Sequence, residues 1–143
     1  MFNFYGPLLI INGSIGNDRL NGGLGNDKLI GVAGADAFIF DSALKNNIDT
    51  ITGFTPKNDQ LQLDSHIFTK LAAGNLAADN FVSGIGVKAQ DFDDYVLFNP
   101  KTGALYYDAD GSGGGVAVKF AVLTGVSDLS ATDFLIIGDS VLL

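Results

Sequence analysis

The aspartates of this chain are spaced in a pattern that suggests a chemical role. The chain has 143 residues and 16 acidic side chains, and every one of them is aspartate. Three of them, Asp18, Asp27 and Asp36, recur nine residues apart, each two residues after a glycine and two residues before a large apolar residue. A short carboxylate in a glycine-rich loop favours turns and the ligation of hard cations. The spacing therefore predicts cation binding.

These aspartates belong to a repeat of nine residues that covers 13–21, 22–30 and 31–39. In each copy the first and fourth positions are glycine, the sixth is aspartate and the eighth is a large apolar residue. A string of glycine-rich turns is the alternative interpretation, but turn chemistry alone does not require a fixed register. The repeat therefore indicates a periodic structure.

The repeat also predicts which elements position the carboxylates. Its glycine-rich part forms a tight loop, because glycine adopts positive φ at little cost, and the three residues around the apolar position form a short strand. Two loops and two strands close one coil, so loops on the same edge lie two repeats apart. Asp18 and Asp36 are then stacked on one edge and Asp27 lies on the other. Stacked carboxylates repel, and Ca²⁺, which accepts six to eight oxygens, relieves that repulsion.

The three repeats resemble the RTX (repeats-in-toxin) nonapeptide G-G-x-G-x-D-x-U-x, a calcium-binding parallel β-roll motif. The resemblance implies that each ion lies between alternate loops. Carried over to this sequence, it implies one site made of the carboxylates of Asp18 and Asp36 and the carbonyl oxygens of Ser14, Gly16, Gly31 and Ala33. It also implies a half-site made of the carbonyls of Gly23 and Gly25 and the carboxylate of Asp27, for which Asp41 and Asp49 are both candidates to complete the ligands.

The sequence departs from the RTX pattern in two places. Ser14 and Val32 replace the second glycine of their repeats, and the stretch 4–12, which would be the preceding repeat, has Leu9 at the aspartate position. The roll is therefore expected to be short, and a roll of so few repeats needs the rest of the chain to cover it.

The remaining sequence predicts an all-β fold, in which a β-roll domain at 1–40 continues into a β-sandwich-like domain at 41–143 with one or two short helices. Alternating apolar residues predict strands at 48–54 and 60–64, a hairpin at 95–107 and a further strand at 116–123. A short helix is expected from Asp64 or Ser65 to Ala73, and a single turn at 130–133.

The later segments are similar to the region that follows the roll in serralysin-type metalloproteases and other type I-secreted RTX proteins. The matching stretches are 36–40, 49–54, 59–64, 106–111 and 133–136. The resemblance does not extend to protease activity, because His66 is the one histidine and no zinc-binding helix is present. The chain is expected not to be an enzyme. Asp91, Asp93 and Asp94 are interpreted as a solvated loop rather than a glycosidase pair.

A second acidic loop begins at Asp108 and Asp110 and continues through a run of glycines to Gly115. An EF-hand is excluded because the twelfth position of the loop is Lys119 and strands flank it. Two interpretations stay open, a calcium site in the hairpin loop and a long glycine-rich turn with solvated aspartates.

Composition excludes several classes of function. The net charge of -8 disfavours nucleic-acid binding, and the absence of cysteine excludes disulfides and thiolate metal sites. No segment approaches the ~20 apolar residues of a transmembrane helix, and the first eleven residues lack the basic start of a signal peptide. The end of the chain, 139–143, resembles the uncleaved signal of type I secretion substrates, with a last edge strand as the alternative.

The predicted function is a secreted, extracellular calcium-binding module that folds when calcium is supplied outside the cell. Its expected partners are calcium ions and a type I secretion transporter. The alternative is a glycan- or surface-binding module of an adhesin or of an extracellular polysaccharide enzyme.

Overall fold

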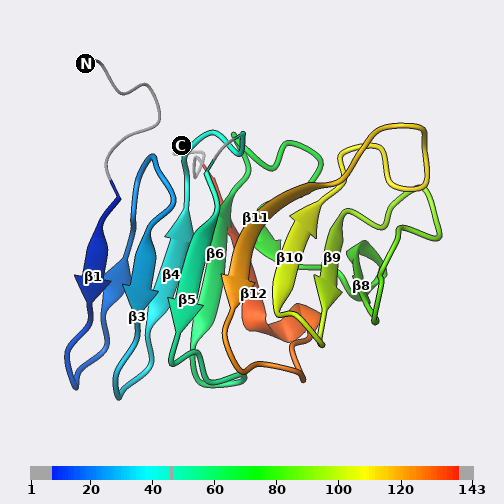
Figure 1. Cartoon of the computed structure of the whole chain (residues 1–143). Coiled ribbons are helices and arrows are strands. Elements are labelled where there is room, and N and C mark those ends of the chain that lie inside the picture. Colours follow the sequence, from blue (N-terminus) through cyan, green and yellow to red (C-terminus); the bar gives the residue numbers. More distant parts are fainter. Residues whose placement is uncertain (1–7, 46, 139–143) are drawn as a thin grey trace.

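The structure is a computed structural model that describes residues 8–45 and 47–138. These residues form two sheets that face each other, with connecting loops along two opposite edges (Figure 1). The seven-stranded sheet contains, in spatial order, β1 (Ile10–Asn12), β3 (Lys28–Ile30), β5 (Asp49–Thr52), β11 (Val118–Leu123), β10 (Ala104–Tyr107), β9 (Val96–Asn99) and β8 (Phe81–Ser83). The five-stranded sheet contains β2 (Arg19–Leu20), β4 (Ala37–Phe40), β6 (Gln60–Asp64), β12 (Phe134–Ile137) and β7 (Gly74–Asn75).

The first six strands form a parallel β-roll. The chain alternates between the sheets, and each strand pairs in parallel with the strand two places later, so that β1, β3 and β5 adjoin in one sheet and β2, β4 and β6 in the other. The apolar eighth positions of the three repeats, Leu20, Leu29 and Phe38, are buried between the sheets. The predicted all-β fold with a short parallel β-roll is therefore confirmed.

A distant part of the chain supplies one more coil. β11 pairs in parallel with β5, and β12 pairs in parallel with β6, so β11, its loop and β12 add to the roll at the end away from β1. In each sheet, strands from before residue 40 therefore pair with strands from after it. The division into domains at 1–40 and 41–143 stays a prediction.

The predicted hairpin is confirmed as β9 and β10, which pair antiparallel, with β11 as the third strand. Phe98 and Tyr107 of this hairpin lie in the core, whereas Tyr106 is half-buried. Phe120 makes edge-on contacts with Phe40 and Phe68, at 5.3 and 5.0 Å between ring centroids, and Phe68 packs edge-on against Tyr107 at 5.1 Å. These contacts join the roll to the hairpin in one hydrophobic core.

The expected short helix at 64–73 is not formed. This stretch makes turns instead, because the backbone N–H of Lys70 donates to the hydroxyl of Tyr107 at 2.9 Å rather than continuing a helical ladder. In the described ranges the helical elements are two 3-10 turns, η1 (Ala78–Asn80) and η2 (Ala131–Asp133). The second is the single turn predicted at 130–133, where the Ser130 N–H donates to Asp133 Oδ2 at 2.9 Å.

Candidate metal centre

Four aspartates follow one another along one edge of the roll, each immediately before a strand of the five-stranded sheet. We call this set the lower-edge ladder, after its position in Figure 1; it consists of Asp18, Asp36, Asp59 and Asp133. The Asp18 N–H donates to Asp36 Oδ1 at 3.0 Å, and the Asp36 N–H donates to Asp59 Oδ1 at 2.8 Å. Asp133 Oδ1 accepts the N–H of Lys57 at 2.7 Å. Each carboxylate after the first therefore ties its own loop to the neighbouring coil.

Two aspartates repeat this arrangement on the opposite edge, and we call them the upper-edge pair: Asp27 and Asp49. Asp27 Oδ1 accepts the N–H of Leu9 at 2.9 Å, and Asp49 Oδ1 accepts the N–H of Asp27 at 2.9 Å. The placement of Asp18 and Asp36 on one edge and Asp27 on the other is as predicted. Of the two candidates to complete the half-site, Asp49 adjoins Asp27, whereas Asp41 accepts a bond from the Asn21 side chain at 3.0 Å.

Two repeat aspartates carry a buried oxygen without a hydrogen-bond donor. Asp27 and Asp36 are each 2% exposed, and among the described residues the Oδ2 atom of each has no donor within reach. A buried acceptor left unsatisfied costs about 1–3 kcal/mol, and more when it is charged. A bound cation would satisfy these atoms, so the donor set fits a hard metal ion at both edges.

The first ladder residue differs, because its own loop satisfies its carboxylate. Asp18 Oδ2 accepts the backbone N–H of Ser14 at 2.6 Å, and the Ser14 hydroxyl lies 3.0 Å from both Asp18 oxygens. Asp36 reaches into this loop through its Oδ1, while the Asp18 carboxylate turns back toward Ser14. The serine that replaces the second repeat glycine therefore occupies oxygens that the RTX pattern assigns to calcium.

The carbonyl positions implied by the resemblance lie in stacked loops. Ser14 and Gly16 lie in the loop between β1 and β2, and Gly31 and Ala33 in the loop between β3 and β4. Gly34, at φ 93°, packs its backbone against the Gly16 carbonyl. On the other edge, Gly23 and Gly25 lie in the loop between β2 and β3. The structure thus brings together the loops that the nonapeptide spacing selects.

A small hollow adjoins the upper-edge pair. Its lining includes Gly23, Asp41, Asn47 and Asp49. Asn47 is 8% exposed, and its Oδ1 is another buried oxygen that lacks a donor within the described part of the chain. Burial raises the pKa of Asp49 to about 6. The hydrogen bond from the Asp27 N–H acts to lower this pKa, and the negative charge of the Asp27 carboxylate acts to raise it. Asn47 is a candidate ligand that sequence analysis missed, because it lies outside the repeat.

Two further asparagines connect the loops, and sequence analysis missed them too. Asn17 Oδ1 accepts the Ala35 N–H at 2.8 Å, and Asn26 Oδ1 accepts the Ile48 N–H at 2.8 Å. Both occupy the fifth position of their repeats, immediately before the aspartate. Their shared position was the signal that could have identified them as links between coils.

The loop from Asp108 to Gly115 joins β10 to β11, and its two aspartates differ in environment. Asp108 is 6% exposed, and its Oδ1 lacks a donor among the residues described. Burial, and next the neighbouring Asp110 carboxylate, raise the pKa of Asp108. Asp110 is exposed, and the Gly115 N–H, which donates to its Oδ2 at 2.7 Å, lowers its pKa.

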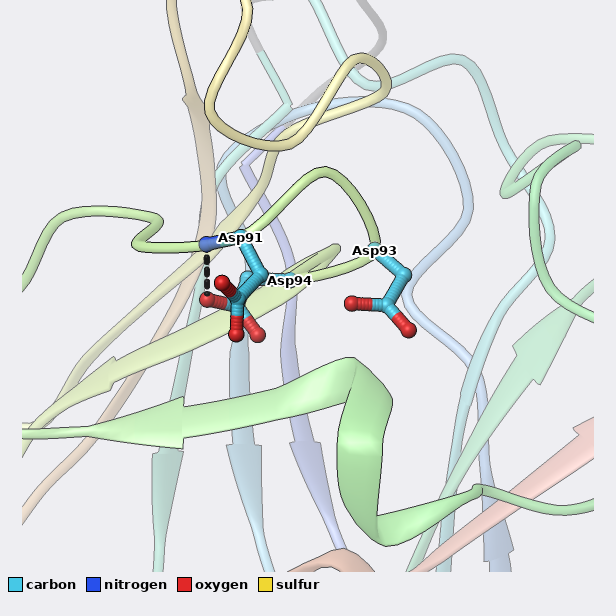
Figure 2. A group of neighbouring side chains, drawn as sticks. All are labelled: Asp91, Asp93 and Asp94. Atoms are coloured by element: carbon cyan, nitrogen blue, oxygen red, sulfur yellow. Dashed lines mark hydrogen bonds between the residues drawn. The ribbon is translucent and has the colours of Figure 1, made fainter.

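Asp91, Asp93 and Asp94 form an acidic cluster in the loop between β8 and β9 (Figure 2), with one oxygen from each within 4.8 Å of the others. Asp94 Oδ2 accepts the N–H groups of Gln90 and Asp91, both at 2.8 Å. Asp94 is buried, so the expected solvated loop describes Asp91 but is wrong for Asp94. The Asp94 bonds close the loop on itself, as an internal cap does.

His66 is exposed on a turn, and its Nδ1 lies 2.7 Å from Asp64 Oδ1. The His66 N–H also donates to that oxygen at 2.8 Å and is the main reason that the pKa of Asp64 is lowered.

In the described ranges, none of the helices has the length and apolar character needed to cross a membrane. The proposed secretion segment, 139–143, lies outside the described residues.

Comparison with known proteins finds weak structural similarity and no match by sequence. No known family model matches the chain, and no curated protein matches it. Among solved structures, the chain is similar to the AlgE6R3 subunit of the Azotobacter vinelandii mannuronan C5-epimerase, with 22% identity and a TM-score of 0.36, over 90% of this chain and 77% of that one. A TM-score of this size does not establish a common fold, and the β-roll described above rests on the strand pairing alone.

Proposed function

We propose that the chain is a calcium-binding, non-catalytic module of a secreted RTX-type protein, and that calcium completes its fold. The observation that carries the proposal is the pair of buried, donorless carboxylate oxygens on Asp27 and Asp36. They belong to the repeated loops, whereas Asp59 Oδ2, outside the repeats, accepts the Thr55 N–H at 2.7 Å. These two unsatisfied oxygens thus lie in loops where the repeat sequence predicts an ion.

The two edges would hold calcium through different residues. On the upper edge the ligands would be the carboxylates of Asp27 and Asp49, the Asn47 side chain and the carbonyls of Gly23 and Gly25. On the lower edge they would be Asp36 and Asp18 with the carbonyls of Ser14, Gly16, Gly31 and Ala33. Bound calcium supplies the positive charge that these oxygens lack, and the chain's residues fix the spacing of the loops. Oxygen ligands of this kind suit Ca²⁺.

Calcium binding of this kind couples folding to the environment. Extracellular calcium modules have Kd values of about 10⁻⁴ to 10⁻³ M, so in the cell such sites would stay empty and the carboxylates would repel. The chain would then remain loose enough for a type I transporter and would fold outside. A ligand that binds the folded state alone stabilises it by mass action. The absence of cysteine agrees with this route, since no disulfide can lock the chain beforehand.

Calcium is expected to increase β-structure and thermal stability in the isolated chain. At a calcium concentration one hundred times Kd, each site contributes about 2.7 kcal/mol to the free energy of unfolding. Circular dichroism through a calcium titration, followed by thermal melts in calcium and in chelator, measures both effects.

The double variant Asp18→Ala plus Asp36→Ala is expected to need more calcium for the same transition, because the lower-edge carboxylates are removed. Asp128→Asn, which changes an exposed side chain that belongs to neither set of edge aspartates, is the control and should titrate like the wild type. A wild-type spectrum and melting curve that are the same in calcium and in excess chelator would count against the proposed function.

Removing the Ser14 hydroxyl is expected to strengthen calcium binding on the lower edge. Calcium must displace the Ser14 bonds to reach Asp18, and a hydrogen bond to a charged group contributes about 1.5–3 kcal/mol. Ser14→Ala should therefore lower the calcium midpoint of the lower-edge transition by roughly ten-fold, as measured by calorimetric titration. An unchanged or raised midpoint would show that Ser14 does not compete with the ion.

The glycan- or surface-binding alternative stays a prediction. Its test is a glycan array probed with the calcium-loaded chain.

A further inference from the structure

The loop between β10 and β11 is held against another part of the chain. The Ser112 N–H donates to the Asp91 carbonyl at 3.0 Å, which fixes the loop to the segment before β9. Gly111 has φ 58°, and a side chain there would overlap the Phe92 carbonyl, so only glycine fits. The loop is thus a positioned structure rather than a free glycine-rich turn.

Asp108 is buried at the base of this loop with one carboxylate oxygen unsatisfied. Its backbone N–H donates to the Tyr95 carbonyl at 2.8 Å and holds the residue in place whatever its side chain binds. The residue is 6% exposed. No donor in the described part of the chain reaches the Oδ1 atom of its carboxylate. Asp108 lines a hollow together with loop residues Gly111, Ser112, Gly113 and Gly115.

The Asp110 carboxylate interacts with that of Asp108 and adds a second negative charge at the loop. The loop backbone wraps its carboxylate: the Gly115 N–H donates to Oδ2 at 2.7 Å, and the Gly113 N–H donates to the Asp110 carbonyl at 3.0 Å. Neither ionised carboxylate can donate to the other, so the pair needs a shared proton or a cation. Lys88 lines the same hollow, yet Asp108 Oδ1 remains without a donor. Lys119 lies instead over the Tyr106 ring, 6.0 Å from its centroid.

We propose that this loop is a calcium site separate from the roll, with the carboxylates of Asp108 and Asp110 as its two charged ligands. Hard oxygen ligands suit Ca²⁺, whose coordination tolerates irregular geometry and water. The ion would fix the end of the hairpin on the segment that carries Asp91. The site does not depend on the nonapeptide loops, so it stands or falls separately from the proposed function.

Terbium, a luminescent substitute for calcium, tests this site through tyrosine sensitisation. Three of the four tyrosines, at 95, 106 and 107, lie beside this loop, and the fourth is Tyr5. In a Tyr5→Phe background, tyrosine excitation should therefore produce terbium emission from the hairpin site, and excess calcium should quench it. Asp110→Asn, which changes an exposed side chain, should abolish the emission, and Asp108→Asn should do the same.

The matched control is Asp27→Asn plus Asp36→Asn in the same background, which removes roll carboxylates and should leave the emission in place. Circular dichroism in excess calcium checks that each variant is folded. Absent emission from the Tyr5→Phe protein would overturn the proposal, and so would emission that survives Asp110→Asn. Emission that is lost in the roll variant while that variant stays folded would assign the signal to the roll and would also overturn it. Calcium stabilisation of the roll, measured by melting, is unaffected by any of these outcomes.

Discussion

Replacing Gly34 with alanine is expected to destabilise the calcium-loaded protein by roughly 2–5 kcal/mol. Gly34 has φ 93°, where a side chain costs about 1–2 kcal/mol. The new methyl group would also overlap the Gly16 carbonyl, a backbone atom that cannot move alone, and overpacking of this kind costs about 1–3 kcal/mol. Denaturant unfolding in excess calcium measures the change in the free energy of unfolding.

Gly23→Ala is the matched control for this change. Gly23 occupies the second position of its repeat at φ 72°, and nothing lies within 4 Å of where its side chain would be. Its alanine variant should therefore show the conformational cost alone, about 1–2 kcal/mol. Equal destabilisation by the two variants would show that the loops of Gly16 and Gly34 are not stacked as described.

The sequence was sufficient to predict this stacking because the repeat carries its own register. A nine-residue period with glycine at fixed positions leaves little choice of loop length, and an inward apolar residue every nine positions leaves little choice of strand. Leu20, Leu29 and Phe38 accordingly lie in the core, and Asp18 and Asp36 share an edge.

The last coil could not be predicted in the same way. β11 joins the roll beside β5, although about 65 residues separate them, and no periodicity marks that pairing. Asp133 occupies the end of the lower-edge ladder, but the sequence around it predicts only a turn before a strand. Long-range parallel pairing is decided by tertiary packing, here by contacts such as that between Phe40 and Phe120.

The candidate site was predictable to the same extent as the repeat. Asp27 lies within the repeat and was found, whereas Asn47 lies in an irregular loop where asparagine is common and has no distinguishing spacing. Only the fold shows that the Asn47 oxygen is buried beside Asp49 without a donor. Asn17 and Asn26 could have been found, because both occupy position five of their repeats. A single repeat does not show, however, that this side-chain oxygen accepts a backbone N–H of the neighbouring coil.

Asp49→Asn is expected to have opposite effects with and without calcium. Burial raises the pKa of Asp49 from its ordinary value of 3.8 to about 6 in the folded state. Between these values the folded state binds more protons than the unfolded state, so stability falls as pH rises from about 4 to about 6 and then stays low. A difference of about two pKa units corresponds to about 3 kcal/mol at neutral pH. Without calcium the variant should therefore be more stable than the wild type above pH 6, by about 1–3 kcal/mol, since the asparagine oxygen can still accept the Asp27 N–H.

In calcium the order should reverse, because the ion binds the ionised carboxylate and the variant lacks it. The measurement is denaturant unfolding of both proteins between pH 4 and pH 8, in excess calcium and in chelator with a stabilising osmolyte that keeps the metal-free chain folded. Subtracting the variant's free energy of unfolding from that of the wild type removes the titration of the other aspartates.

Two outcomes would contradict this prediction. A difference that is independent of pH in chelator would mean that burial of the ionised Asp49 carboxylate does not destabilise the folded state. A variant that gains as much stability from calcium as the wild type would mean that Asp49 is not a ligand. A folded state that tolerates a buried charge in chelator and uses it in calcium is what a calcium-triggered fold requires, since the same carboxylate then opposes folding before the ion arrives and favours it afterwards.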